Sequence, residues 1–161
     1  MLLTALRYSH QLLKEIISEG DYVIDATMGN GNDTLFLAEL VGSTGHVYAF
    51  DIQKQALQNT REKLADYTDR ATLFLAGHET IEEKIAVDQP IQAAIFNLGY
   101  LPKSDKHIIT LPETTKQAMS AILKRLTIGG RVIVVIYYGH EGGEAEKNEV
   151  LHFCQALPQE K

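Results

Sequence analysis

The stretch YVIDATMGNGNDT, residues 22–34, decides the fold. An apolar, strand-like segment ends at Asp25, and a helix-like segment begins at Asp33. The two glycines between them let the backbone approach a ligand closely because they carry no Cβ, and the helix start offers free N–H groups. This order predicts a nucleotide-like ligand at the first crossover of an α/β sheet. The alternative is an ordinary strand-to-helix turn that contains two glycines.

The turn does not fit the dinucleotide fingerprint G-x-G-x-x-G, because the third glycine would fall at position 34 and that residue is Thr34. An acidic residue that closes the strand, followed by Gly-x-Gly, instead resembles motif I of class I S-adenosylmethionine (SAM) methyltransferases. That resemblance places Asp25, Thr27 and Gly29 at the cofactor.

Composition is that of one ordinary globular domain over residues 1–161, with 45% hydrophobic and 22% charged residues. The single cysteine, Cys154, excludes an internal disulfide and a multi-cysteine metal site. No apolar run is long enough to span a bilayer, and the first residues lack the pattern of a signal peptide, so we expect a cytoplasmic protein. The net charge of −6 argues against a broad nucleic-acid-binding surface but not against a small basic one.

Strand-like and helix-like segments alternate along the chain, which predicts a doubly wound parallel sheet. Continuous apolar strands such as 132–136 are typical of a sheet covered by helices on both faces. The predicted strands are 22–26, 46–50, 71–75, 91–97 and 131–138, and the predicted helices are 4–18, 33–41, 53–66, 79–85, 112–126 and 143–156.

The predicted elements do not include the strands that usually end this fold. Class I methyltransferases usually finish with two more strands, the last of them antiparallel beside the fifth, whereas this sequence reaches Lys161 just after a predicted helix. Strand 131–138 would then be an exposed apolar edge, which favours association. We therefore expect a Rossmann-like sheet lacking the last two strands, and either a truncated product or a homodimer through the fifth-strand edge.

Polar residues follow the second and third predicted strands. Asp51 ends the second strand, where a carboxylate can accept hydrogen bonds from both ribose hydroxyls of a nucleoside, and Gln53 in the same turn is within reach of the adenosine. The alternative for Asp51 is a helix cap. Gly77 and His78 follow the third strand, so His78 is a candidate to stack on or hydrogen-bond the adenine, or else an ordinary capping residue.

The segment 97–102, Asn-Leu-Gly-Tyr-Leu-Pro, directly follows the fourth strand. It is similar to the Asn/Asp-Pro-Pro-Tyr motif of methyltransferases that act on amine nitrogens. The amide oxygen of Asn97 would accept a hydrogen bond from the attacking amine, and Tyr100 would stack on a flat substrate. This places Asn97 next to both cofactor and substrate. The alternative is a structural Gly-Tyr turn ended by Pro102.

Two further loops carry candidate residues for the rim of the site. Tyr138 and His140 follow the fifth strand, where His140 is a candidate for a phosphate contact or for moving a proton. The spacing of His140 to the nearby glutamates matches no known metal site, so we expect no metal. Lys103 and Lys106 are candidates for RNA phosphate contacts, with an ordinary solvated loop as the alternative.

Together these segments resemble a small bacterial family labelled rRNA methylases, which includes tRNA 5-aminomethyl-2-thiouridine methyltransferases. The segments that carry the resemblance are 25–34, 96–102 and 138–143. The resemblance implies that SAM is held by Asn30, Asn32, Asp51, Gln53, Gly77 and His78. It also implies that the substrate faces Asn97, Leu98, Gly99, Tyr100, Leu101, Pro102 and His140. Two departures are Lys103-Ser104 in place of small residues and the absence of the family's C-terminal Asn-Gln…Pro-Pro region.

The resemblance therefore implies a SAM-dependent N-methyltransferase that modifies the wobble uridine in the anticodon stem-loop of tRNA. Three other hypotheses stay open at this point: methylation of rRNA, methylation of a small molecule, and a non-catalytic SAM-binding module. A nicotinamide-dependent oxidoreductase is disfavoured by the missing third glycine.

Overall fold

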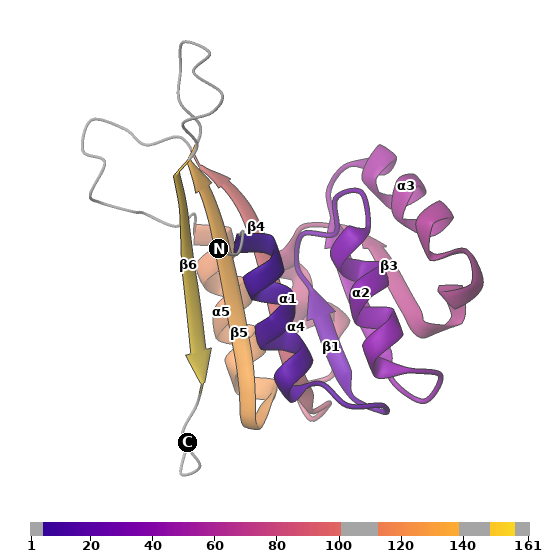
Figure 1. Cartoon of the computed structure of the whole chain (residues 1–161), viewed down its shortest axis with the longest axis horizontal. Coiled ribbons are helices and arrows are strands. Elements are labelled where there is room, and N and C mark those ends of the chain that lie inside the picture. The colour runs from indigo at the N-terminus through magenta and orange to yellow at the C-terminus, as the bar shows by residue number, and fades with distance from the viewer. Residues whose placement is uncertain (1–4, 101–112, 139–148, 157–161) are drawn as a thin grey trace.

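A computed structural model of the chain describes residues 5–100, 113–138 and 149–156. Helices and strands alternate through most of this length (Figure 1). The strands are β1 (Tyr22–Asp25), β2 (His46–Asp51), β3 (Ala71–Leu75), β4 (Ile91–Tyr100), β5 (Leu126–Tyr138) and β6 (Glu149–Ala156). The helices are α1 (Ala5–Ile16), α2 (Asn32–Val41), α3 (Lys54–Leu64), α4 (Ile81–Lys84) and α5 (Glu113–Arg125), with short 3-10 helices η1 (Ala65–Arg70) and η2 (His78–Thr80).

The six strands form one sheet in the order β3-β2-β1-β4-β5-β6. Strands β1 to β5 are parallel, and β6 is antiparallel to β5. The strand order reverses between β1 and β4, and this is the position where open α/β sheets bind ligands, beyond the carboxyl ends of the strands. The predicted doubly wound α/β sheet and its five parallel strands are confirmed.

Each face of the sheet is covered by its own set of helices. Neighbouring residues of one strand belong to opposite faces: Val23 packs with Leu13 of α1 and Leu37 of α2, whereas Ile24 packs with Ile122 of α5. All five side chains are fully buried. Because both faces need apolar residues, the strands read as continuous apolar runs rather than as alternating ones.

The predicted helix over 143–156 is wrong, because residues 149–156 form strand β6. This strand pairs along β5, from Tyr138 opposite Glu149 to Arg131 opposite Ala156. An unpaired β5 would leave a row of backbone N–H and C=O groups without partners, and pairing with β6 satisfies them. The prediction that both final strands are missing is therefore wrong, and so is the prediction of an exposed fifth-strand edge. The homodimer was argued from that exposed edge, so the argument for it no longer holds.

Two smaller boundaries also differ from the predicted ones. The helix predicted over 79–85 is the 3-10 turn η2 followed by the single-turn α4. The strand predicted over 131–138 begins earlier, at Leu126, and contains an irregularity between the pairs Ile91–Leu126 and Ala93–Arg131. The left-handed backbone of Gly129, with φ +85°, accommodates this irregularity.

A close approach between α2 and α3 fixes the glycine turn after β1. Gly31 precedes α2 with φ +91°, and a Cβ on this residue would lie 2.8 Å from the Cα of Thr60 in α3. The buried Thr60 hydroxyl donates a hydrogen bond to the Gly29 carbonyl at 3.0 Å. Since a backbone atom of α3 occupies the space, only glycine fits at position 31. In the part of the chain that the structure describes, no helix is long and apolar enough to cross a membrane.

We predict that Gly31→Ala destabilises the protein more than Gly129→Ala does. Both substitutions place a side chain on a left-handed backbone, which costs about 1–2 kcal/mol. Only Gly31→Ala adds a clash, because nothing lies within 4 Å of a Cβ built at Gly129, and overpacking costs about 1–3 kcal/mol more. Urea unfolding of the two variants measures the difference. Equal losses of unfolding free energy would show that the α2–α3 approach adapts to a methyl group.

Candidate functional site

The carboxylate of Asp51 joins the ends of β1 and β2. One oxygen accepts a hydrogen bond from the Gly29 N–H at 3.1 Å, and the other accepts from the Gln53 N–H at 2.9 Å. The Asp51 carbonyl also accepts from the Ala76 N–H, directly after β3. The glycine turn and the loops after β2 and β3 are thus held together at one point. Each carboxylate oxygen has a second lone pair, so Asp51 keeps the capacity to accept hydrogen bonds from a ligand.

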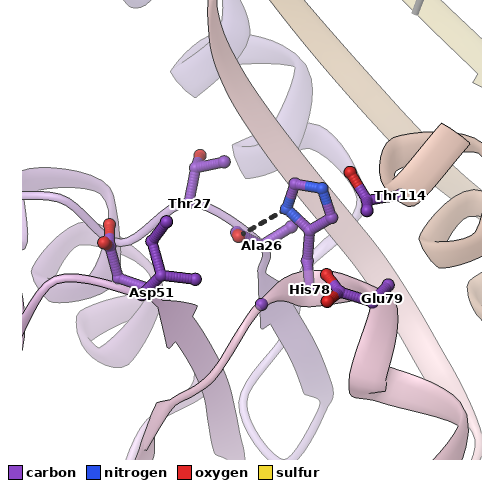
Figure 2. Close-up of a pocket in the computed structure, with 8 residues that line it drawn as sticks. Ala26, Thr27, Asp51, His78, Glu79 and Thr114 are labelled. Carbon is purple, nitrogen blue, oxygen red and sulfur yellow. Dashed lines mark hydrogen bonds between the residues drawn. The ribbon is translucent and has the colours of Figure 1, made fainter. Parts of the chain in front are cut away.

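A cavity of about 320 Å³ opens beside Asp51 at this edge of the sheet. Figure 2 shows Asp51 and His78 on either side of the turn that contains Ala26 and Thr27. The lining residues are Ala26, Thr27, Asp51, Ile52, Gly77, His78, Glu79 and Thr114. The structure therefore brings together four residues named from the sequence: Thr27, Asp51, Gly77 and His78.

Four lining residues were missed by sequence reasoning: Ala26, Ile52, Glu79 and Thr114. Ile52 is 74% exposed, which is unusual for an apolar side chain. The sequence signal that could have identified it is its position directly after Asp51. Glu79 likewise follows His78 in the chain. Thr114 lies in the first turn of α5, far from the other residues in sequence, and no local pattern points to it.

His78 forms a wall of the cavity with both of its ring nitrogens already engaged. Nδ1 lies 3.1 Å from the Ala26 carbonyl oxygen, and Nε2 lies 3.2 Å from the Thr115 hydroxyl. A carbonyl only accepts hydrogen bonds, so Nδ1 donates to Ala26, and Nε2 is engaged by the Thr115 hydroxyl. The ring also meets Phe96 edge-on, with centroids 5.3 Å apart. Both ring nitrogens of His78 are thus engaged within the protein, and its expected contact with the adenine stays a prediction.

Asp25 lies beneath the turn and is fully buried. It accepts hydrogen bonds from the Thr34 hydroxyl at 2.6 Å and from the Thr27 N–H at 3.2 Å. Burial, and then the neighbouring charge of Asp33, raise the pKa of Asp25 to about 7, although these two hydrogen bonds act in the opposite direction. The expected cofactor contact of Asp25 remains a prediction, and its observed contacts hold the turn.

The asparagines of the turn lie toward α3 rather than in the wall of the cavity. Asn59 donates its amide N–H to Asn30 Oδ1 at 3.0 Å, and the Lys63 ammonium donates to Asn32 Oδ1 at 2.6 Å. A second, more open hollow of about 450 Å³ lies there, lined by Asn30, Asn59, Glu62 and Lys63. Gln53 is exposed at the start of α3. The SAM contacts expected of Asn30, Asn32 and Gln53 stay predictions.

Asn97 lies on β4 beyond the end of β1, and its backbone N–H donates to the Thr27 hydroxyl at 2.7 Å. Its side-chain amide donates an N–H to Asp33 in the first turn of α2. Asp33 also contacts Nε2 of His10 in α1, at 2.6 Å. The Asn97 amide oxygen is buried and has no hydrogen-bond partner among the residues that the structure describes. A buried acceptor without a partner is costly, which indicates a place for a ligand donor.

Sequence reasoning missed His10 and Asp33. Asp33 lies inside the glycine stretch, but it was treated only as a helix start. His10 lies on the apolar face of the first helix, at helical spacing from Leu6, Leu13 and Ile17. A polar residue on that face is the signal that could have identified it.

The remaining predicted residues lie at the ends of β4 and β5 or outside the described residues. Gly99 pairs with Tyr137 and Tyr100 with Tyr138, so these backbones share the carboxyl edge of the sheet with Asn97. Leu101, Pro102, Lys103, Lys106 and His140 lie outside the described residues. Among the residues of the described ranges, no group of His, Cys, Asp and Glu has the arrangement of a metal site.

The family model described as "Putative rRNA methylase" matches residues 47–161. The chain belongs to this rRNA methylase family. The resemblance drawn from the segments 25–34, 96–102 and 138–143 is therefore confirmed.

Three relatives illustrate the place of the chain in this family. It is 39% identical to an Arabidopsis thaliana protein named tRNA (mnm(5)s(2)U34)-methyltransferase, chloroplastic, over 96% of this chain but only 60% of that protein. The crystal structure of a "putative rRNA-methylase" from Clostridium thermocellum is 50% identical, with a TM-score of 0.76 and coverage of 91% of this chain and 79% of that one. A "putative methyltransferase" from Streptococcus mutans, solved in complex with SAH, is 36% identical, with a TM-score of 0.74 and coverage of 98% and 100%.

We predict that Asp25→Asn removes a pH-dependent loss of stability. Between pH 3.8 and about 7 the folded protein keeps a proton on Asp25 that the unfolded chain has released, so this group lowers the free energy of unfolding as pH rises through that window. The difference in unfolding free energy, variant minus wild type, should rise by on the order of 1 kcal/mol per pH unit from pH 4 to 7 and then level off. Urea titrations at several pH values measure it. A difference that does not change with pH would refute the raised pKa.

Proposed function

We propose that this rRNA methylase family member binds SAM in the cavity beside Asp51 and transfers a methyl group to an amine nitrogen of RNA. The acceptor we propose is the aminomethyl nitrogen of 5-aminomethyl-2-thiouridine at the wobble position of tRNA. The observation that carries this proposal is the buried amide oxygen of Asn97 at the carboxyl edge of the sheet, which has no hydrogen-bond partner among the described residues. The name of the Arabidopsis relative supports the choice of acceptor.

The residues around the cavity fit an adenosine-containing cofactor. Asp51 retains lone pairs for the two ribose hydroxyls. The exposed Ile52 and the fixed ring of His78 offer contact surfaces for a flat base, and Gly77 has no side chain to obstruct it. The cavity volume of about 320 Å³ lies at the lower end of the range for small-molecule sites. The complex of the Streptococcus mutans relative with SAH supports the same ligand class.

When bound, SAM supplies a methyl group that is already activated on a sulfonium centre. The protein's contribution is then to position the amine and to keep it unprotonated. An alkylamine is mostly protonated at neutral pH, so its proton must leave before the lone pair can attack. The Asn97 amide does not titrate in this range and is not a base. Its oxygen accepts an N–H hydrogen bond and so aims the amine lone pair at the methyl group.

We propose that desolvation at the carboxyl edge of the sheet lowers the pKa of the amine and that His140 passes its proton on to solvent. Tyr100 is proposed to stack on the substrate base, with Gly99, Leu101, Pro102 and Tyr138 around it. Lys103 and Lys106 are proposed to contact phosphates of the anticodon stem-loop. A small basic rim of this kind is compatible with the net charge of −6, because only a few phosphates need to be contacted.

Methyl transfer from labelled SAM to tRNA that carries 5-aminomethyl-2-thiouridine tests the proposal directly. Nucleoside mass spectrometry should find the label on the aminomethyl group, and the reaction should slow as salt increases, because phosphate contacts weaken with salt. Label on rRNA instead would support methyltransferase activity but identify a different acceptor. Salt-independent transfer to a small amine would contradict an RNA substrate. SAM binding without any transfer would indicate a binding module.

We predict that Asn97→Ala lowers kcat for methyl transfer by about 100-fold and leaves SAM affinity nearly unchanged. The variant loses the acceptor that orients the amine, and misplacement of a reacting group costs rates of this order. Gln58→Ala, which removes an exposed amide from α3, is the control and should match wild type. Steady-state kinetics and calorimetry with SAM separate the two effects. Loss of SAM binding in the Asn97 variant would place this residue in the cofactor site instead.

A further inference from the structure

A chain of side-chain contacts runs from α1 through α2 to β4. His10 Nε2 lies 2.6 Å from Asp33 Oδ1, and Asp33 Oδ2 accepts an N–H from the Asn97 amide. The Asp33 side chain is only 6% exposed, and that of His10 is 25% exposed. The His10 ring is itself fixed, because it stacks on Phe36 with centroids 3.9 Å apart and planes 6° from parallel. All three polar groups are therefore held in place before any ligand binds.

This arrangement determines which end of the Asn97 amide is presented to the site. An amide has a donor end and an acceptor end of nearly the same shape, and both orientations fit the same space. An ionised carboxylate only accepts hydrogen bonds. The Asp33 carboxylate therefore selects the orientation with the NH₂ group turned toward it, which leaves the Asn97 oxygen on the other side, where it has no partner among the described residues.

From this geometry we infer that Asp33 and His10 are positioning residues, which fix the Asn97 amide so that its oxygen is the group available to the substrate amine. This inference rests on the proposed function and adds to it the origin of the amide orientation. Asp33 and His10 do not touch the amine and act only through Asn97. Without Asp33, the amide would be free to turn its NH₂ group toward the amine, and two donors would then face each other.

Several features favour a negative charge on Asp33. It lies in the first turn of α2, where the free N–H groups and the helix dipole stabilise an anion. His10 Nε2, at 2.6 Å from Asp33 Oδ1, can donate an N–H to the carboxylate. The nearby Asp25 is the carboxyl whose pKa is raised, in part by the charge of Asp33.

A mutant cycle on methyl transfer tests the inference. Asp33→Asn, which can both donate to and accept from the amide, should lower kcat by on the order of tenfold or more and leave SAM affinity and the KM for tRNA nearly unchanged. The same substitution in an Asn97→Ala background should have almost no further effect, because Asp33 acts through that amide. Additive losses, or loss of SAM binding, would overturn the inference and give Asp33 a role of its own.

Substitutions at His10 provide a second set of variants if Asp33→Asn does not fold. His10→Gln keeps an N–H donor for Asp33, whereas His10→Ala removes it. We expect His10→Ala to lower kcat several-fold and His10→Gln to restore most of that loss, with thermal unfolding used to confirm that both are folded. Equal activity of the two variants, whether high or low, would show that the hydrogen bond from His10 has no positioning role.

Side-chain amide NMR separates this inference from the proposed function, because it needs no turnover. With SAH added, the Asn97 NH₂ protons should be shifted downfield and slowed in exchange by the Asp33 carboxylate, and Asp33→Asn should abolish both effects. The NH₂ of Asn59, which donates to Asn30, is the internal reference and should not change. Asn97 NH₂ signals that are the same in wild type and in Asp33→Asn would refute the inference. Wild-type protein that fails to methylate RNA, with these NMR effects present, would instead refute only the proposed function.

Discussion

The hydrogen bonds of the Asp51 carboxylate hold the site in place. This carboxylate accepts from Gly29 in the turn after β1 and from Gln53 at the start of α3, so one side chain joins two crossovers of the sheet. The Thr60 hydroxyl, from further along α3, closes the same turn by donating to the Gly29 carbonyl. Because the turn is fixed from both sides, Thr27 is placed where its hydroxyl meets the backbone of Asn97 on β4.

Two buried carboxyl groups close together cannot both be charged at low cost, and the structure gives them different environments. Asp25 lies at the end of β1, where burial raises its pKa to about 7. Asp33 lies at the beginning of a helix and contacts His10. Asp33 lies next to Asn97 and accepts an N–H from its side-chain amide. A pair of similar residues thus takes two different roles.

The sequence predicted much of the fold because its signals are local. The apolar run 132–136 requires cover on both faces, and the glycine turn after Asp25 requires a strand before it and a helix after it. The error at 149–156 has a physical reason: its apolar residues fit either period, and only the unpaired backbone of β5 makes a strand the better solution. At the site, Asp51 and His78 could be named because they directly follow strands. Thr114 could not, since α5 brings it in from a distant part of the chain.

The sequence by itself determined the α/β class, the glycine turn, the polar residues at the strand ends and the resemblance to methylases, because each depends on residues close together in the chain. Tertiary structure alone decided how these residues are used. It turned Asn30 and Asn32 toward α3, engaged both nitrogens of His78 and brought His10 to Asp33 across 23 positions of sequence. The reason is that hydrogen bonds between elements depend on how helices pack on the sheet, and local sequence patterns do not encode which end of an amide faces its partner.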